Sequence, residues 1–225
     1  MKNIKYITII ILLASSIAFA GEGSSNLDKF FFAGGWLIWP LLGLSIITIN
    51  LIIQIGYNIR TRRFYNNTLI KDVKEHLRHE NYSNCLELLK GNTSVLARVL
   101  NAGLNEKKIG HEAMENAMVE IIEDERGEFF RKLEWLNIIG NIAPMIGLFG
   151  TVWGMIQAFN GIVEAGGRPQ PPDLAGGISN ALVTTLWGMA VAIPALAASG
   201  YLGNRFDALT AKIAVIAEEL LISDK

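Results

Sequence analysis

The chain has little cysteine, little proline and no excess of either charge, and each shortage excludes a class of protein. Its one cysteine, Cys85, cannot form an internal disulfide or a CxxC zinc site. His76 and His79 lie near it in sequence, but among charged residues and with no fourth ligand for a metal. No GxxxxGK[ST] phosphate loop and no HExxH motif occurs. We therefore expect a protein that is not an enzyme, with no cofactor and no metal. A formal net charge of −1 gives no basic footprint, so no nucleic-acid partner is expected.

Apolar residues are abundant instead. The sequence is 51% hydrophobic and 18% charged, which is too apolar for an ordinary soluble domain of 225 residues. Three segments are long enough to cross a bilayer: residues 36–57, 135–162 and 175–203. None of them contains Asp, Glu, Lys, Arg or His. The sequence therefore predicts an all-α membrane protein with three transmembrane helices and long cytoplasmic helical extensions.

The first 20 residues have the pattern of a cleavable signal peptide. Lys2 and Lys5 precede a short apolar run that ends in Ala18-Phe19-Ala20. The alternative is an uncut anchor, and both alternatives place residue 21 outside the cytoplasm. Residues 21–35 are expected to form a periplasmic tail and an interfacial segment.

The distribution of positive charge predicts the orientation of the chain in the membrane. Thirteen Lys and Arg lie between residues 58 and 134, and three more follow residue 204. Only Lys29 and Arg168 lie in the two outer segments. By the positive-inside rule, the N-terminus is periplasmic and the C-terminus cytoplasmic. Residues 58–134 then form a cytoplasmic helical region, residues 163–174 a periplasmic turn, and residues 204–225 a cytoplasmic C-terminal helix.

Turn and capping residues divide the cytoplasmic region into helices. Residues 81–83 and 91–94 are expected breaks, and either Thr93 or Ser94 is suited to cap a helix from residue 95 to 104. Ala113, Ala117, Ile121 and Ile122 share one side of a longer amphipathic helix. Because no proline occurs between Pro40 and Pro144, this helix is expected to run from about residue 111 into the membrane, to about residue 161.

Small residues line one side of each of the last two membrane segments. Glycines seven residues apart keep one face of a helix against a neighbour, and small side chains let the two backbones come close. The residues assigned to helix packing are Gly140, Pro144, Gly147, Gly150, Gly154, Gly161, Gly177, Gly188 and Pro194.

Hydroxyl groups lie on the same two segments. Thr151 is in the second, and Thr184 and Thr185 are in the third. Each threonine can simply bond to a carbonyl of its own helix. If the helices are antiparallel, however, all three fall at middle depth, where polar groups are costly unless water or a polar partner meets them. We therefore predict an ion pathway lined by these threonines. Since no Asp, Glu, Lys, Arg or His lies in the membrane segments, a proton relay would need a carboxylate from another polypeptide.

The sequence around these residues resembles the ExbB/TolQ/MotA proton-channel family, most closely ExbB and then TolQ. Residues 142–155, IAPMIGLFGTVWGM, resemble the second transmembrane helix of that family. Residues 177–196 are similar to the third helix, and residues 35–41, GWLIWPL, to the start of the first.

The resemblance implies a homopentamer around a central cavity. The cavity would hold the single transmembrane helices of an ExbD- or TolR-like partner, which carries the proton-binding Asp. The two pore threonines of the family match Thr151 and Thr185. ExbB and TolQ members also carry a glutamate on the third helix, and the matching position here is Asn180. With asparagine in place of glutamate, an ionisable lining group is missing here. Both a proton and a sodium ion therefore remain candidates for the transported ion.

The resemblance thus implies an ExbB-like subunit of an ion-driven motor in the bacterial inner membrane, coupled to a TonB-type energy transducer for transport across the outer membrane. Two alternatives remain open from the sequence. One is a TolQ-like subunit for envelope maintenance, and the other is a non-conducting scaffold for a single-span partner.

Overall fold

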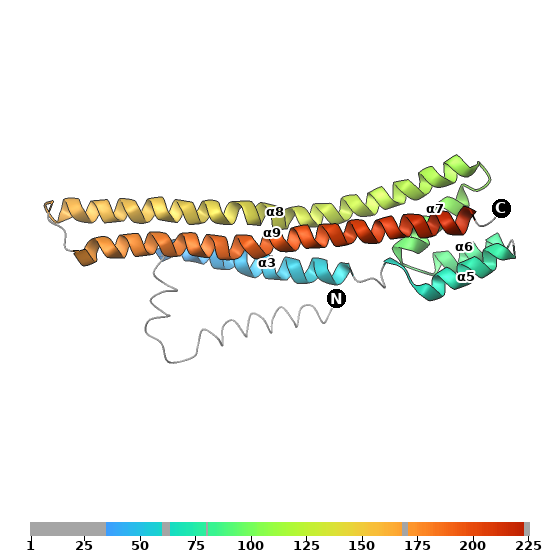
Figure 1. Cartoon of the computed structure of the whole chain (residues 1–225), viewed down its shortest axis with the longest axis horizontal. Helices are drawn as coiled ribbons and strands as arrows, with labels where there is room; N and C mark the ends of the chain where they lie inside the picture. The colour runs from blue at the N-terminus through green and yellow to red at the C-terminus, as the bar shows by residue number, and fades with distance from the viewer. Residues whose placement is uncertain (1–34, 60–63, 80, 168–170, 223–225) are drawn as a thin grey trace, which may run out of the picture. The chain divides into compact units, whose positions relative to one another are not determined.

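The computed structural model describes residues 35–59, 64–79, 81–167 and 171–222. Every regular element in these ranges is helical. The elements are η1 (Gly35–Leu37), α3 (Ile38–Asn58), α5 (Asn67–Arg78), α6 (Tyr82–Lys90), α7 (Val95–Asn105), α8 (His111–Glu164) and α9 (Pro171–Ile222) (Figure 1). Three stretches are long and apolar enough to cross a membrane: Gly35–Asn58, His111–Glu164 and Leu174–Leu221. The predicted all-α membrane fold is thereby confirmed. The predicted signal peptide lies outside the described residues.

The chain forms two compact units. One, the membrane unit, contains residues 35–54 and 135–199, and the other, the polar unit, contains residues 55–134 and 200–222. Helices α8 and α9 each contribute to both units. The continuous α8 confirms the prediction of one long helix beginning at residue 111.

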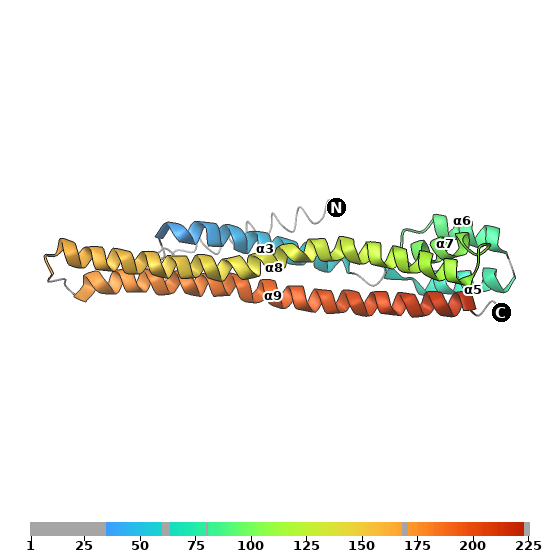
Figure 2. The ribbon, with the colours of Figure 1, turned by 90° about the horizontal axis from the view of Figure 1, so that it is seen from above.

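In the membrane unit, α3 packs against α8 and α9, which run antiparallel (Figure 2). A buried apolar cluster joins the three helices, and it contains Leu41, Ile139, Ala143, Val191 and Ala192. The opposite faces of α8 and α9 expose large apolar side chains, among them Met145, Leu148 and Ile193. Such a distribution suits a bilayer, because lipid tails solvate apolar side chains as well as a protein core does.

In the polar unit, capping residues fix where the short helices begin. The side chain of Asn66 accepts a hydrogen bond from the backbone N–H of Thr68 at the start of α5 (3.2 Å). The Oγ of Ser94 accepts one from the N–H of Ala97 at the start of α7 (3.3 Å). Of the two capping candidates at the start of α7, the structure therefore selects Ser94. Each cap satisfies a backbone donor that would otherwise lack a partner.

The buried side of α8 in the polar unit differs slightly from the expected one. The four residues of the expected side are half-buried, and the buried positions beside them are Met114 and Met118. The deepest burial thus lies one residue after Ala113 and Ala117, on the side where Ile122 also lies, and the expectation did not include the two methionines. Methionine fills irregular gaps well because its side chain is unbranched and flexible.

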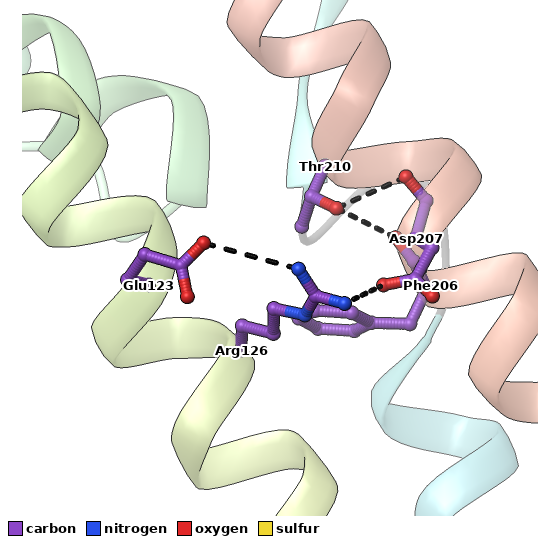
Figure 3. A network of polar contacts seen from close by, with 5 residues as sticks. All are labelled: Glu123, Arg126, Phe206, Asp207 and Thr210. Carbon is purple, nitrogen blue, oxygen red and sulfur yellow. Dashed lines mark hydrogen bonds and ion pairs between the residues drawn. The ribbon is translucent and has the colours of Figure 1, made fainter.

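Aromatic side chains form a cluster in the polar unit. The ring of Phe206 on α9 stacks on Phe129 of α8, with 4.1 Å between centroids, and meets Phe64 edge-on at 5.5 Å. Beside the cluster, Arg126 lies between Glu123 and Asp207, with N–O distances of 3.9 and 3.6 Å (Figure 3). The rings are buried, whereas about half of the Arg126 side chain is exposed. Burial of the rings is therefore the larger source of stability here.

Candidate functional site: the seam between α8 and α9

The two long helices of the membrane unit approach each other closely along a line of small residues, which we call the seam. It is formed by Gly147, Gly150 and Gly154 on α8 and by Gly177, Ala181, Thr184, Thr185 and Gly188 on α9. A Cβ at Gly188 would lie 2.6 Å from the carbonyl oxygen of Ala143. A Cβ at Gly154 would lie 2.8 Å from the carbonyl oxygen of Gly177. Since real Cβ atoms do not come so near a backbone oxygen, this helix spacing requires glycine at both positions.

The seam leads to a prediction with an internal control on the same helix. Gly188→Ala is expected to destabilise the folded protein by about 1–3 kcal/mol, because the new methyl group must push two backbones apart. Gly176→Ala is the matched control, since a Cβ there meets nothing within 4 Å. It should be neutral or stabilising by about 0.5–1 kcal/mol, as alanine favours a helix. The thermal midpoint of the detergent-solubilised protein distinguishes the two, and equal shifts would contradict the close packing.

Two adjacent threonines of α9 reach the same carbonyl on α8. The Oγ1 of Thr185 donates a hydrogen bond to the carbonyl oxygen of Gly147 at 3.1 Å. The Oγ1 of Thr184 lies 3.5 Å from that oxygen and 2.8 Å from the carbonyl oxygen of Ala181 on its own helix. A hydroxyl has one proton, and the shorter distance favours the bond within α9. The hydroxyl that links the two helices is therefore that of Thr185.

Thr151 lies one turn beyond Gly147 on α8, and its hydroxyl stays within its own helix. Its Oγ1 donates to the carbonyl oxygen of Leu148 at 2.6 Å. The side chain is half-buried, as is that of Thr185, whereas Thr184 is 1% exposed. Thr151 and Thr184 thus bond within their own helices, which is the simpler of the two alternatives given from the sequence. Thr185 instead bonds to the other helix. A lining role for Thr151 stays a prediction.

These hydroxyls retain the capacity to bind a further group. A carbonyl oxygen can only accept, so each threonine must be the donor in the bonds described above. The lone pairs of Thr151 and Thr185 then remain available to accept a hydrogen bond from water or to contact a dehydrated cation. A half-buried hydroxyl with free lone pairs is the kind of group that an ion pathway needs.

Asn180 lies one turn before Thr184 on α9 and lines a small pocket. The pocket has a volume of about 40 Å³, and it is bounded by Gly35, Trp36, Leu37, Gly150, Trp153, Gly154, Gln157 and Asn180. That volume is enough for a few water molecules. The amides of Asn180 and Gln157 supply neutral donors and acceptors to a lining that is otherwise mainly apolar and carries no charge. Gln157 was not among the residues singled out from the sequence, since a lone amide in an apolar segment carries no motif.

The remaining packing residues occupy different positions. Gly140 faces the side chain of Leu196, and a Cβ there would lie 2.5 Å from its Cγ. Pro144 is half-buried and Pro194 is exposed, and the helices continue through both. Nothing lies within 4 Å of a Cβ built on Gly161, so a packing role for Gly161 stays a prediction.

Two further polar features of the membrane unit were not found from the sequence. The hydroxyl of Ser199 bonds to the Oδ1 of Asn137 at 2.6 Å and joins α9 to α8. Thr48 on α3 is 2% exposed, and its hydroxyl has no hydrogen-bond partner among the described residues. From the sequence, hydroxyls were considered only on the last two segments, so Thr48 on the first was passed over. The pairing of Ser199 with Asn137 joins two helices and has no local sequence signal.

Comparison with known proteins gives consistent matches. A family model described as the MotA/TolQ/ExbB proton channel family matches residues 91–214. The biopolymer transport protein exbB1 of Vibrio cholerae is 29% identical over 182 residues, which cover 80% of each chain. A putative biopolymer transport protein, ExbB-like 1, of Synechocystis is 30% identical over 82% of this chain and 73% of its own. The Tol-Pal system protein TolQ of Pseudomonas aeruginosa is 32% identical over 48% of this chain and 46% of its own.

Proposed function

This chain belongs to the MotA/TolQ/ExbB proton channel family, and from that premise we propose that it is the ring-forming subunit of an ion-driven motor. It is a multi-pass membrane protein of the bacterial inner membrane. In the proposed orientation the N-terminus is periplasmic and the C-terminus cytoplasmic, which places the polar unit in the cytoplasm. The ring is a homopentamer around a central cavity.

The observation that carries this proposal is the hydrogen bond from Thr185 to the carbonyl of Gly147. It puts a hydroxyl within the closely packed seam of α8 and α9, with Thr151 one turn away. The hydroxyls of Thr185 and Thr151 are costly at that depth in a bilayer unless a polar group meets them, and an ion pathway would supply that group. Thr151, Thr185, Thr184 and Asn180 are proposed to line that path.

The proton-binding group of the motor comes from another chain. The membrane segments of this chain contain no Asp, Glu, Lys, Arg or His, whereas a proton relay through a membrane usually needs such a group. We assign it to an Asp within the single transmembrane helix of an ExbD/TolR-like partner held in the ring. The partner Asp would take up and release the ion beside the threonine hydroxyls.

The electrochemical gradient supplies the energy. One charge that crosses 100 mV releases about 2.3 kcal/mol. A packed interface has discrete arrangements, so a few such steps can turn the ring relative to the partner helices. The partner then acts on a TonB-like energy transducer, which drives transport across the outer membrane.

The ion is proposed to be a proton, with sodium as the alternative. The alternative rests on Asn180 and Gln157, whose amide oxygens, like threonine hydroxyls, are neutral oxygen ligands suited to a dehydrated metal cation. A second process, TolQ-like envelope maintenance, is supported by the 32% identity to a TolQ protein over 48% of this chain.

Selective collapse of each gradient tests this proposal in living cells. A strain that depends on the chain for energised outer-membrane transport should lose transport when a protonophore is added and keep it when a sodium ionophore is added. The reverse result would assign sodium. Transport that survives both treatments would contradict the proposal of an ion-driven motor and would favour the alternative of a non-conducting scaffold. Purification of the tagged chain should in parallel yield a single-span protein with an intramembrane Asp.

A further inference from the structure

The polar unit has an apolar groove that its own side chains do not fill. The groove lies between α7, α8 and α9 and has a volume of about 100 Å³, the scale of a side chain and not of a helix. Its floor and walls are apolar, and the residues that line it are Val99, Met114, Met118, Val119, Ile122, Ala214, Ala217 and Leu221, with His111, Glu115 and Glu218 also on its border.

One exposed aliphatic side chain of the polar unit lines this groove, and two others lie near lining residues in sequence. Among the described residues of the unit, the large aliphatic side chains that are exposed are Ile109, Val119 and Val215. Val119 lines the groove, and Val215 follows the lining residue Ala214 in sequence. An apolar groove with an exposed aliphatic side chain on its wall is the kind of surface that a partner covers.

The third exposed residue, Ile109, forms the tip of the turn between α7 and α8. It is 75% exposed, and the backbone holds it in place: its N–H donates to the carbonyl of Glu106 at 2.9 Å. Gly110 follows with φ 142°, a conformation that side-chain-bearing residues rarely adopt. Lys108, directly before the tip, is exposed. The turn therefore presents one apolar side chain beside a positive charge.

The charges of the groove and of the tip are opposite. Glu115 and Glu218 are both exposed at the border of the groove. The last turn of α9 contains no basic residue, and the helix end itself carries partial negative charge. A cation brought to this border is thus favoured by two carboxylates and by a helix terminus.

From this complementarity we propose that the groove receives the Lys108–Ile109 turn of a second copy of this chain. Ile109 of one copy enters the groove of the next, and Lys108 pairs with Glu218 or Glu115. Tip and groove are different patches of one surface, so the contact is head-to-tail, and repetition of it generates a ring if the rotation closes. Ile109 lies two residues before His111, which is at the groove border, so the tip and the groove lie at the same end of α8. A ring whose axis runs along the helices requires this, because contacting patches of neighbouring copies must lie at the same height. This inference rests on the proposal that the subunits form a ring.

Cross-linking between two differently tagged full-length copies tests the contact. Both copies carry Cys85→Ala, one carries Ile109→Cys, and the other carries Val119→Cys. After oxidation in membranes, a linked dimer that contains both tags should form in several-fold higher yield than the dimers of either single variant alone. Ser83→Cys, an exposed position on α6, replaces Val119→Cys as the off-groove control. A yield no higher than in this control would overturn the proposal.

Charge reversal adds a second readout. Lys108→Glu should lower the yield of the Ile109–Val119 cross-link several-fold, and Glu218→Lys in the same chains should restore it. An unchanged yield in Lys108→Glu would contradict the charge pairing. Native mass spectrometry on the same sample distinguishes the two levels of failure. Only single chains would contradict the ring itself, whereas multimers without the cross-link would contradict this contact alone and assign the groove to another protein.

Discussion

Thr185→Val is expected to abolish gradient-driven work and to leave the ring assembled. The substitution keeps the shape of the side chain but removes the hydroxyl that donates to the carbonyl of Gly147. Hydrogen bonds between membrane helices contribute on average only about 0.6 kcal/mol, so packing should survive. A pathway that needs the hydroxyl lone pairs, by contrast, loses an essential ligand. The measurement compares energised transport in cells with the oligomer mass of the purified variant.

The conservative variants make this test specific. Thr185→Ser restores a hydroxyl at the same position and should recover transport. Thr151→Val should have the same effect as Thr185→Val, although its hydroxyl bonds within α8. Unchanged transport in both valine variants would refute the proposed path. Lost transport together with lost assembly would instead indicate a packing role for these threonines.

Phe206→Ala is expected to destabilise the folded protein by about 3–5 kcal/mol, which is typical for the loss of a buried phenylalanine. The ring is 2% exposed and touches Phe64 and Phe129, so its removal leaves a cavity that α8 and α9 cannot easily close. Arg126→Ala, at the border of the same cluster (Figure 3), is the comparison. Its ion pairs are about half exposed and should contribute about 1 kcal/mol or less.

Thermal denaturation of the purified full-length protein separates these two contributions. The midpoint of Phe206→Ala should fall far below that of the native chain, and that of Arg126→Ala should stay near it. If the arginine variant lost as much stability as the phenylalanine variant, electrostatic pairing and not ring burial would hold this part of the protein together.

Local patterns predicted much of the fold. The continuity of α8 up to Pro144 followed from the absence of an earlier proline, although the helix also continues through Pro144. The close approach of the two long helices followed from the spacing of small residues. The spacing does not say where the approach ends. In the structure, Gly154 meets Gly177. Gly161 is the next glycine of the seven-residue spacing, and nothing lies within 4 Å of a Cβ built on it. The seam is therefore shorter than the repeat of glycines.

Other features depend on contacts that no local pattern encodes. Thr184 and Thr185 are adjacent, and only the rotation of α9 determines which hydroxyl crosses to α8. Arg126 and Asp207 are 81 positions apart (207 − 126), and nothing in the sequence near either residue indicates the other. From the sequence alone, the residues around Ile109 likewise indicate only an ordinary turn, and the exposure of Ile109 is known only from the structure.

Ion flux into proteoliposomes tests the central claim most directly. The claim is that this chain supplies uncharged, hydroxyl-bearing walls, while a partner helix supplies the carboxylate that carries the ion. Vesicles with this chain alone should be impermeable, vesicles with chain and single-span partner should conduct, and Asp→Asn in the partner helix should stop the flux. Flux through this chain alone, or flux that persists after the Asp→Asn substitution, would contradict the account.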